Sequence, residues 1–106
     1  MILVTSDEIP GRTISKTIGL VRGNTIRARN IGRDILAVFR NMIGGEISDY
    51  TKMLAEAREQ ALDRMQEEAL ALGANAIVGI RFASAEVMQG AAELLVYGTA
   101  VVLDED

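Results

Sequence analysis

Two charged side chains, Arg64 and Glu68, interrupt a segment whose apolar residues recur at helical spacing. Glu68 falls at the same helical angle as Tyr50, in the middle of the apolar stripe, with Arg64 one turn earlier and Arg58 beside the stripe. A carboxylate in that position has to be paired or hydrogen-bonded. Arg58, Arg64 and Glu68 are therefore our candidate ligand-binding residues. An ion pair across a subunit interface explains the same pattern, and we prefer that interpretation.

Three further acids, Glu59, Asp63 and Glu67, recur at four-residue intervals on the same segment. Carboxylate oxygens at that spacing could bind a hard cation such as calcium or magnesium. The three acids lie opposite the apolar stripe, however, and no neighbouring loop supplies more ligands. We therefore predict a solvated helix face rather than a metal site.

Glycines and arginines in the first half of the chain could bind phosphate. Gly44-Gly45 precedes a helix, where backbone NH groups favour anions, but Glu46 would repel a phosphate and no phosphate-loop motif is present. We interpret the glycine pair as a joint between two helices. Four arginines could form a basic strip that binds RNA or phosphate. No aromatic residues are interleaved with them, so we expect the strip to protect a strand edge or to pair with acids of a neighbour. The strip consists of Arg22, Arg27, Arg29 and Arg33.

The composition excludes many kinds of active site. The chain has neither cysteine nor histidine, so it has no thiolate or imidazole for nucleophilic catalysis, for general base catalysis or for binding soft metals. No serine, threonine or lysine has the sequence context of an activated nucleophile. We identify no cofactor and no catalytic residue, and we expect a protein that is not an enzyme. The net charge of −4 argues against a nucleic acid partner.

The length and the N-terminal segment predict one soluble domain. The 106 residues, about half of them hydrophobic, suit a single core over residues 1–106. The first residues, MILVTSDEIPGRT, lack the basic region of a secretion signal, and no apolar run approaches the roughly 20 residues that span a bilayer. Together with the absence of cysteine, these features lead us to expect a cytoplasmic protein with no membrane partner.

The sequence predicts strands in the first third of the chain. Ile2–Thr5 is a short β-prone run, and Pro10-Gly11 has the residue types of a tight turn. Alternation over residues 13–23 and again over residues 24–29 predicts extended structure. Gly23-Asn24 between these two runs fits either a bulge or a two-residue hairpin turn, and the sequence leaves both possibilities open.

Helical spacing follows over residues 30–43 and again, for longer, over residues 48–72. Ser48 is the expected N-cap of the second helix and Gly73 its C-terminal stop. The apolar stripe of the second helix is rich in alanine, which lets its axis lie close to a sheet. The stripe consists of Tyr50, Leu54, Ala57, Ala61, Met65 and Leu72.

Two strands, residues 76–87 and 92–103, are expected to form a hairpin around Gly90. The second of them is apolar on both parities, so both of its faces should be buried. The order β-β-α-α-β-β predicts an α+β domain with a largely antiparallel sheet and helices on one face. The chain has no obvious element for the second face, so we expect another copy of the chain to cover it. Each large aliphatic side chain left exposed would forgo about 1.5–3 kcal/mol.

Several segments together resemble the YbjQ-like family of small bacterial and archaeal proteins, which carries the description "putative heavy-metal-binding". They are GLVRG at 19–23, RD at 33–34, GGE at 44–46 followed by Tyr50, EAREQA at 56–61, LGANAIVGIRF at 72–82 and YGTAV at 97–101. The resemblance implies a two-layer fold like a dodecin subunit, assembled as a homopentamer. A metal ion is implied by the family description alone. Relatives often have an acid after GIRF, where this chain has Ala83 and Ser84.

The sequence therefore predicts a non-enzymatic homo-oligomer, pentameric by resemblance, that binds a metal ion or a small ligand in clefts between subunits. The alternative is a structural ring that contacts protein partners through its acidic helix face.

Overall fold

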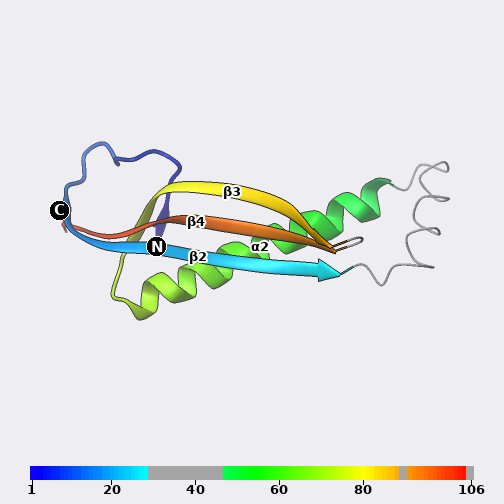
Figure 1. Ribbon diagram of the computed structural model, residues 1–106. Coiled ribbons are helices and arrows are strands. Elements are labelled where there is room, and N and C mark those ends of the chain that lie inside the picture. Colours follow the sequence, from blue (N-terminus) through cyan, green and yellow to red (C-terminus); the bar gives the residue numbers. More distant parts are fainter. Residues whose placement is uncertain (29–46, 89–90, 105–106) are drawn as a thin grey trace.

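The computed structural model describes residues 1–28, 47–88 and 91–104. Within them, four strands form one sheet in the order β1-β3-β4-β2, and one helix lies along one face of the sheet (Figure 1). β1 is parallel to β3, and the other neighbouring strands are antiparallel. The α+β class and the largely antiparallel sheet are confirmed; the helix expected at residues 30–43 lies outside the described residues. The elements are β1 (Ile2–Leu3), β2 (Ile14–Ala28), α2 (Ile47–Ala71), β3 (Ala76–Met88) and β4 (Ala91–Leu103).

β2 is a single strand that runs straight through Gly23-Asn24. Its pairing with β4 continues without a break from Gly19 to Ala28, so both readings of Gly23-Asn24, a bulge and a hairpin turn, are wrong. The irregularities of this pairing lie earlier, between Ile14 and Lys16 and between Thr17 and Gly19. Gly23 has a packing role instead. A Cβ at Gly23 would collide with the carbonyl oxygen of Ala61 and would lie 2.6 Å from the backbone nitrogen of Met65, so only glycine lets α2 approach this closely.

The N-terminal segment contains the expected turn, but it pairs with a different strand from its sequence neighbour. The Arg12 N–H donates to the Ile9 carbonyl oxygen at 3.1 Å, and Gly11 has φ of 81°. Pro10 followed by a left-handed glycine is the pattern of a type II turn. The strand expected over Ile2–Thr5 is shorter, and β1 pairs in parallel with β3 rather than with β2.

α2 confirms the long helix to within a residue at each end. It begins at Ile47, so Ser48 lies inside the first turn rather than at the N-cap position. Its last residue is Ala71, and Gly73, the predicted C-terminal stop, follows two residues later with a φ of 89°. The Gly73 N–H donates to the Leu70 carbonyl oxygen and the Ala74 N–H to the Ala69 carbonyl oxygen, both at 3.0 Å. This pair of bonds is a Schellman motif, which satisfies two carbonyl groups at the end of the helix.

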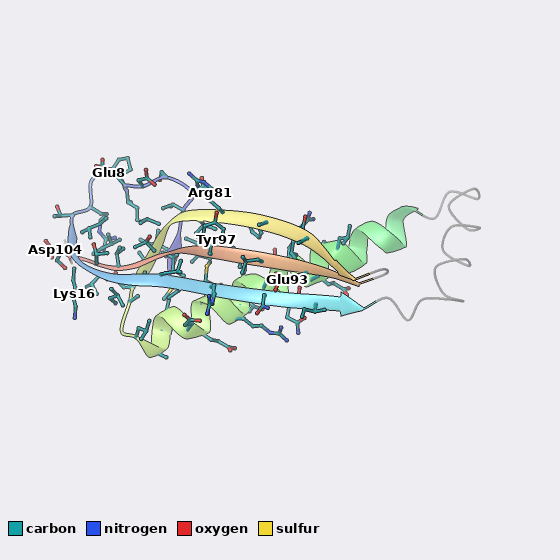
Figure 2. All side chains as sticks on the ribbon, in the orientation of Figure 1. Glu8, Lys16, Arg81, Glu93, Tyr97 and Asp104 are labelled. Atoms are coloured by element: carbon teal, nitrogen blue, oxygen red, sulfur yellow. The ribbon has the colours of Figure 1, made fainter. Side chains whose placement is uncertain are left out.

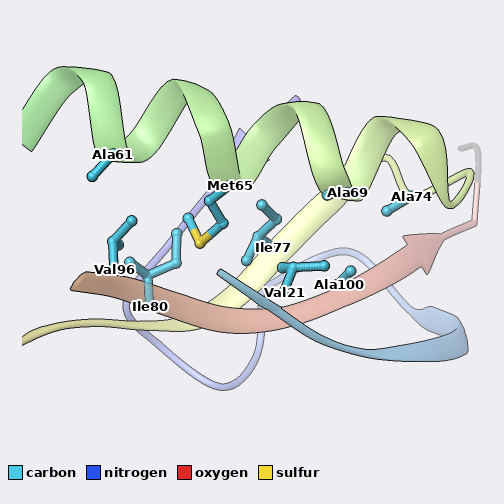
Figure 3. Packing of buried hydrophobic residues seen from close by; sticks show 9 residues of the cluster. All are labelled: Val21, Ala61, Met65, Ala69, Ala74, Ile77, Ile80, Val96 and Ala100. Carbon is cyan, nitrogen blue, oxygen red and sulfur yellow. The ribbon is translucent and has the colours of Figure 1, made fainter. Parts of the chain in front are cut away.

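The main core lies between α2 and the sheet face beneath it (Figure 3). The helix contributes one line of residues at four-residue spacing, Ala57, Ala61, Met65 and Ala69, all of which are buried. Three of these four are alanines, so the predicted close approach is confirmed. Leu54 and Leu72, which were expected in the same stripe, are 38% and 53% exposed because they lie toward the ends of the helix, beyond this core. The sheet contributes mainly Val21, Ile77, Ile80, Val96 and Ala100.

The rear face, by which we mean the sheet face turned away from α2, is covered at one end by the chain itself. Ala76, Val78, Val101 and Leu103 are buried there. The first residues of the chain pack over them, so the expectation that no element of this chain could cover the second face is wrong for this end of the sheet. The covering side chains include Ile2, Val4 and Ile9.

Candidate functional site

Arg64 joins α2 to the outer strand β2. Its Nη1 donates to the Asn24 carbonyl oxygen at 2.6 Å. The side-chain Nδ2 of Asn24 in turn donates to Oε2 of Glu93 at 3.1 Å. These hydrogen bonds link a helix and two strands in one polar group that is exposed to solvent. Arg64 reaches the backbone of β2 from the helix side, whereas the side chains of Asn24 and Glu93 lie on the rear face, so each part of this group can bind a charged or polar group at the edge of β2.

Glu68 does not lie where the helical angle placed it. Its side chain is exposed, so the prediction that this carboxylate sits inside the apolar stripe and needs a buried partner is wrong. The buried line of α2 passes through Met65 and Ala69, and Glu68 lies to one side of it. Residues four apart differ by about 40° around a helix, so Glu68 and Arg64 share one side of α2. The structure gives Arg64 a hydrogen bond to Asn24 rather than an ion pair with Glu68.

Arg58 is separate from the other two candidates. It is also exposed, and it is six residues from Arg64. Six residues correspond to about 120° around the helix and about 9 Å along it. The structure therefore brings Arg64 and Glu68 to one side of α2 but does not bring Arg58 to them within one subunit.

The acids Glu59, Asp63 and Glu67 are exposed, which confirms the solvated helix face. Among the residues that the structure describes, no three acids lie close enough together to hold a metal ion. The sequence has no cysteine or histidine. Thiolate and imidazole are the donors that soft metals prefer, so the donor set of this chain does not fit a heavy-metal ion.

Beside the polar group, the rear face carries exposed apolar side chains. Leu20 and Ile26 of β2 are 63% and 59% exposed, and Tyr97 of β4 is 38% exposed. Figure 2 shows Tyr97 on β4 beside Arg81 of the neighbouring strand, with Glu93 farther along β4. We call this part of the sheet the open end: residues 20–26 of β2, 81–85 of β3 and 93–97 of β4. Apolar surface next to convergent polar groups is the usual composition of a ligand cleft.

Asn24 and Glu93 were not among the residues selected from the sequence. They are far apart in the chain, and only the pairing of β2 with β4 brings them together. The alternation of β2 could have placed Asn24 on the rear face, but the sequence gives no sign of its partner. Of the basic strip, Arg22 is exposed on β2. Gly44-Gly45, Arg29 and Arg33 lie outside the described residues, as does the side chain of Arg27.

Comparison with known proteins gives consistent matches over the full length. The model of the YbjQ family, described as "Putative heavy-metal-binding", matches residues 1–104. A UPF0145 protein of Clostridioides difficile is 57% identical over 106 residues, covering 100% of this chain and 95% of the relative. A UPF0145 protein of Methanosarcina acetivorans is 52% identical, covering 95% of each chain. A UPF0145 protein of Thermus thermophilus is 51% identical, covering 98% of this chain and 91% of the relative.

Among solved structures, the fold resembles a protein of unknown function from Pediococcus pentosaceus that belongs to the DUF74 family. The TM-score is 0.67, with 18% sequence identity and 98% of each chain covered. At that identity the likeness shows the fold alone.

Proposed function

Since this chain belongs to the YbjQ family, whose description names a binding role and no reaction, we propose that it is a non-enzymatic homo-oligomer that binds a small ligand in clefts between subunits. The ring contains five copies, a number that comes from the family resemblance, and its subunits resemble those of dodecin. A chain without cysteine suits the reducing cytoplasm, which is the compartment we propose for it.

One observation carries this proposal: exposed apolar side chains lie beside a hydrogen-bonded polar group. Leu20 and Ile26 are more than half exposed, although a leucine or isoleucine gains about 1.5–3 kcal/mol when it is buried. The polar group of Arg64, Asn24 and Glu93 lies at the same end of the sheet. A second copy beside β2 would contact these apolar side chains and would leave the polar group at the boundary between the two copies.

The ligand class follows from the charges at this boundary. Arg64 has donors for an anionic group, and Glu68 and Glu93 can accept hydrogen bonds from a cationic or hydroxylated group. A small molecule that carries both kinds of group fits this set. A heavy-metal ion does not fit it, despite the family description, because the chain has no thiolate or imidazole.

Two measurements test the proposal. Sedimentation at dilute concentration is expected to show an oligomer, and native mass spectrometry of protein purified from its own cells is expected to show a bound small species in constant ratio to the subunits. Glu68→Gln and Arg64→Gln are expected to weaken retention of that species without dissociating the oligomer. Glu59→Gln, on the opposite side of α2, is the matched control and should retain it.

Other outcomes would contradict the proposal. A folded single chain at dilute concentration would exclude the cleft. If Glu68→Gln dissociates the oligomer, Glu68 is an interface residue rather than a ligand-binding one. A co-purifying protein in place of a small species would favour the structural ring, whose contact surface would be the exposed acidic face of α2.

A further inference from the structure

Among the described strands, β3 and β2 each have a segment with no strand on its outer side, and the two segments lie opposite the same residues of β4. We propose that the free edge of β3, residues 81–86, pairs with the free edge of β2, residues 19–28, of a second copy of this chain, so that the sheet continues from subunit to subunit. This inference rests on the homo-oligomer proposed above and specifies how its copies join.

The free edge of β3 begins where the N-terminal segment leaves it. β1 pairs with β3 at Ala76 and Ile77, and backbone hydrogen bonds continue only as far as Gly79 N–H to the Ser6 oxygen and Ile80 N–H to the Val4 oxygen. From Arg81 to Glu86 the strand is in regular register with β4, and no other described strand lies on its outer side. A regular strand with unpaired backbone groups is a ready template for another strand.

The free edge of β2 has the same properties. β2 is the last of the described strands in the sheet, and its irregular pairing is confined to the part before Gly19. From Gly19 to Ala28 the strand is regular, and bulges of the kind that blunt an edge are absent from this described segment. β2 therefore offers a second template at the opposite side of the subunit.

The two free edges lie opposite the same part of β4. Arg22 of β2 and Arg81 of β3 both pair with Tyr97, and Asn24 and Ala83 both pair with Leu95. β2 and β3 run parallel to each other because each is antiparallel to β4. A copy rotated about an axis along the strands therefore brings its β3 beside this β2 at the same height and in the parallel direction. Such a contact joins two unlike surfaces and can close into a ring.

The position of α2 supports this pairing. α2 packs mostly on β2 and least on β3, so it covers the sheet unevenly. Phe82 pairs with Val96, which is buried under α2, and therefore lies on the helix side of the sheet, where it is still 47% exposed. With β2 of the next subunit beside β3, the helix of that subunit would lie over the uncovered side of Phe82.

The pairing also completes the candidate site. Arg64 and Asn24 lie at the edge of β2, where the second copy would arrive. The hydrogen bond of Arg64 to the Asn24 oxygen uses one carbonyl of this edge, and the exposed side chain of Arg64 can move aside or donate to the incoming strand. Arg81 of the partner subunit, on the same face as Tyr97, would then form the second wall of the cleft beside Asn24 and Glu93.

Disulfide scanning tests the pairing directly, because the chain has no cysteine of its own. Arg22→Cys is combined in turn with Arg81→Cys or Ala83→Cys, which lie on the same face as Arg22, and with Phe82→Cys or Ser84→Cys, which lie on the other. Within one chain β4 separates β2 from β3, so the two cysteines are at least about 9.6 Å apart. That exceeds the roughly 7 Å limit for a disulfide, so every bond formed joins two chains.

The expected result of mild oxidation is a ladder of cross-linked chains for one or both of the same-face pairs, with several-fold less product for the Phe82 and Ser84 pairs. Arg22→Cys alone should give little product. Strong dimer formation by Arg22→Cys alone would show that β2 pairs with β2 and would overturn the inference, as would cross-linking that does not alternate with residue number. Sedimentation of the reduced variants separates the two proposals: oligomers without alternating cross-links overturn this inference only, whereas single chains overturn the proposed function as well.

Discussion

The two ends of the rear face differ in what covers them, although the same three strands form both. We call the end with Ala76, Val78, Val101 and Leu103 the closed end. There, Val101 and Leu103 of β4 are buried beneath the N-terminal segment. At the open end, Tyr97 of the same strand and the same face is 38% exposed, and Leu20 on β2 is 63% exposed. A β-strand has the same residue alternation along its length, so the difference comes from the cover and not from the strand.

The comparison shows how one strand can serve two purposes. The closed end has aliphatic side chains on both faces and stabilises the subunit. The open end keeps its helix side buried, at Val21 and Val96, while its rear face mixes leucine, isoleucine and tyrosine with arginine and asparagine. That mixture is typical of surfaces that associate, because it tolerates water before the partner arrives.

The largest effect is expected from Met65→Ala, which removes the central side chain between α2 and the sheet. Met65 is fully buried, so the change should lower the free energy of unfolding by about 2–5 kcal/mol. Denaturant unfolding at a fixed protein concentration measures it. Leu70→Ala on the same helix is the control, because Leu70 is 60% exposed and should change stability by less than about 0.5 kcal/mol. Equal losses for the two variants would contradict the placement of the core.

The second largest effect is expected from Gly23→Ala, which should lower the free energy of unfolding by about 1–3 kcal/mol. The new methyl group would meet the backbone of α2 at Ala61 and Met65, which cannot move without shifting the helix. The measurement is again denaturant unfolding, compared with Thr17→Ala, an exposed position on the same strand. A neutral Gly23→Ala would show that α2 lies farther from β2 than the structure has it.

Gly73→Ala, just beyond the end of α2, is expected to lower the free energy of unfolding by a smaller amount, about 1 kcal/mol. The φ of 89° at Gly73 is unfavourable for a residue with a Cβ, and the Schellman hydrogen bonds depend on it. Gly73→Asn is the informative companion, since asparagine tolerates the left-handed region better than alanine. In thermal unfolding, the melting temperature should be highest for the unchanged protein, lower for Gly73→Asn and lowest for Gly73→Ala. A higher melting temperature for Gly73→Ala than for Gly73→Asn would contradict the backbone explanation.

Local signals in the sequence were sufficient for much of the fold. Pro10-Gly11 predicts a turn and Gly73 predicts the end of a helix, because few residue types are compatible with each of these backbone conformations. The alanines of α2 predict a close helix, which the glycine at position 23 then makes possible. The apolar character of both faces of β4 predicted a cover on each face, and for the rear face this is confirmed only at the end where Val101 and Leu103 are buried. The identity of the second cover was missed because Ile2, Val4 and Ile9 are spaced irregularly and give no periodic signal.

The candidate site was harder to predict because it depends on strand pairing. Helical angle placed Arg64 and Glu68 on one side of α2, which holds, but it could not show that the buried line passes beside Glu68 rather than through it. Asn24 and Glu93 meet only through the register of β2 with β4. A single sequence does not specify that register, since a shift by two residues preserves the same alternation.

The smallest effect on the subunit itself, and the sharpest test of the open end, is expected from Ile26→Thr. Ile26 is 59% exposed on the rear face, so a subunit that acts alone should lose no more than about 0.5 kcal/mol. If a second copy covers this surface, the same change should shift sedimentation toward smaller species and lower the melting temperature at a given protein concentration, because association then contributes less stability. Leu70→Thr is the matched control, because Leu70 is 60% exposed on α2, away from the sheet. Unchanged assembly in Ile26→Thr, or equal weakening by both variants, would mean that the open end has no special part in association, and that its exposed aliphatic side chains need another explanation.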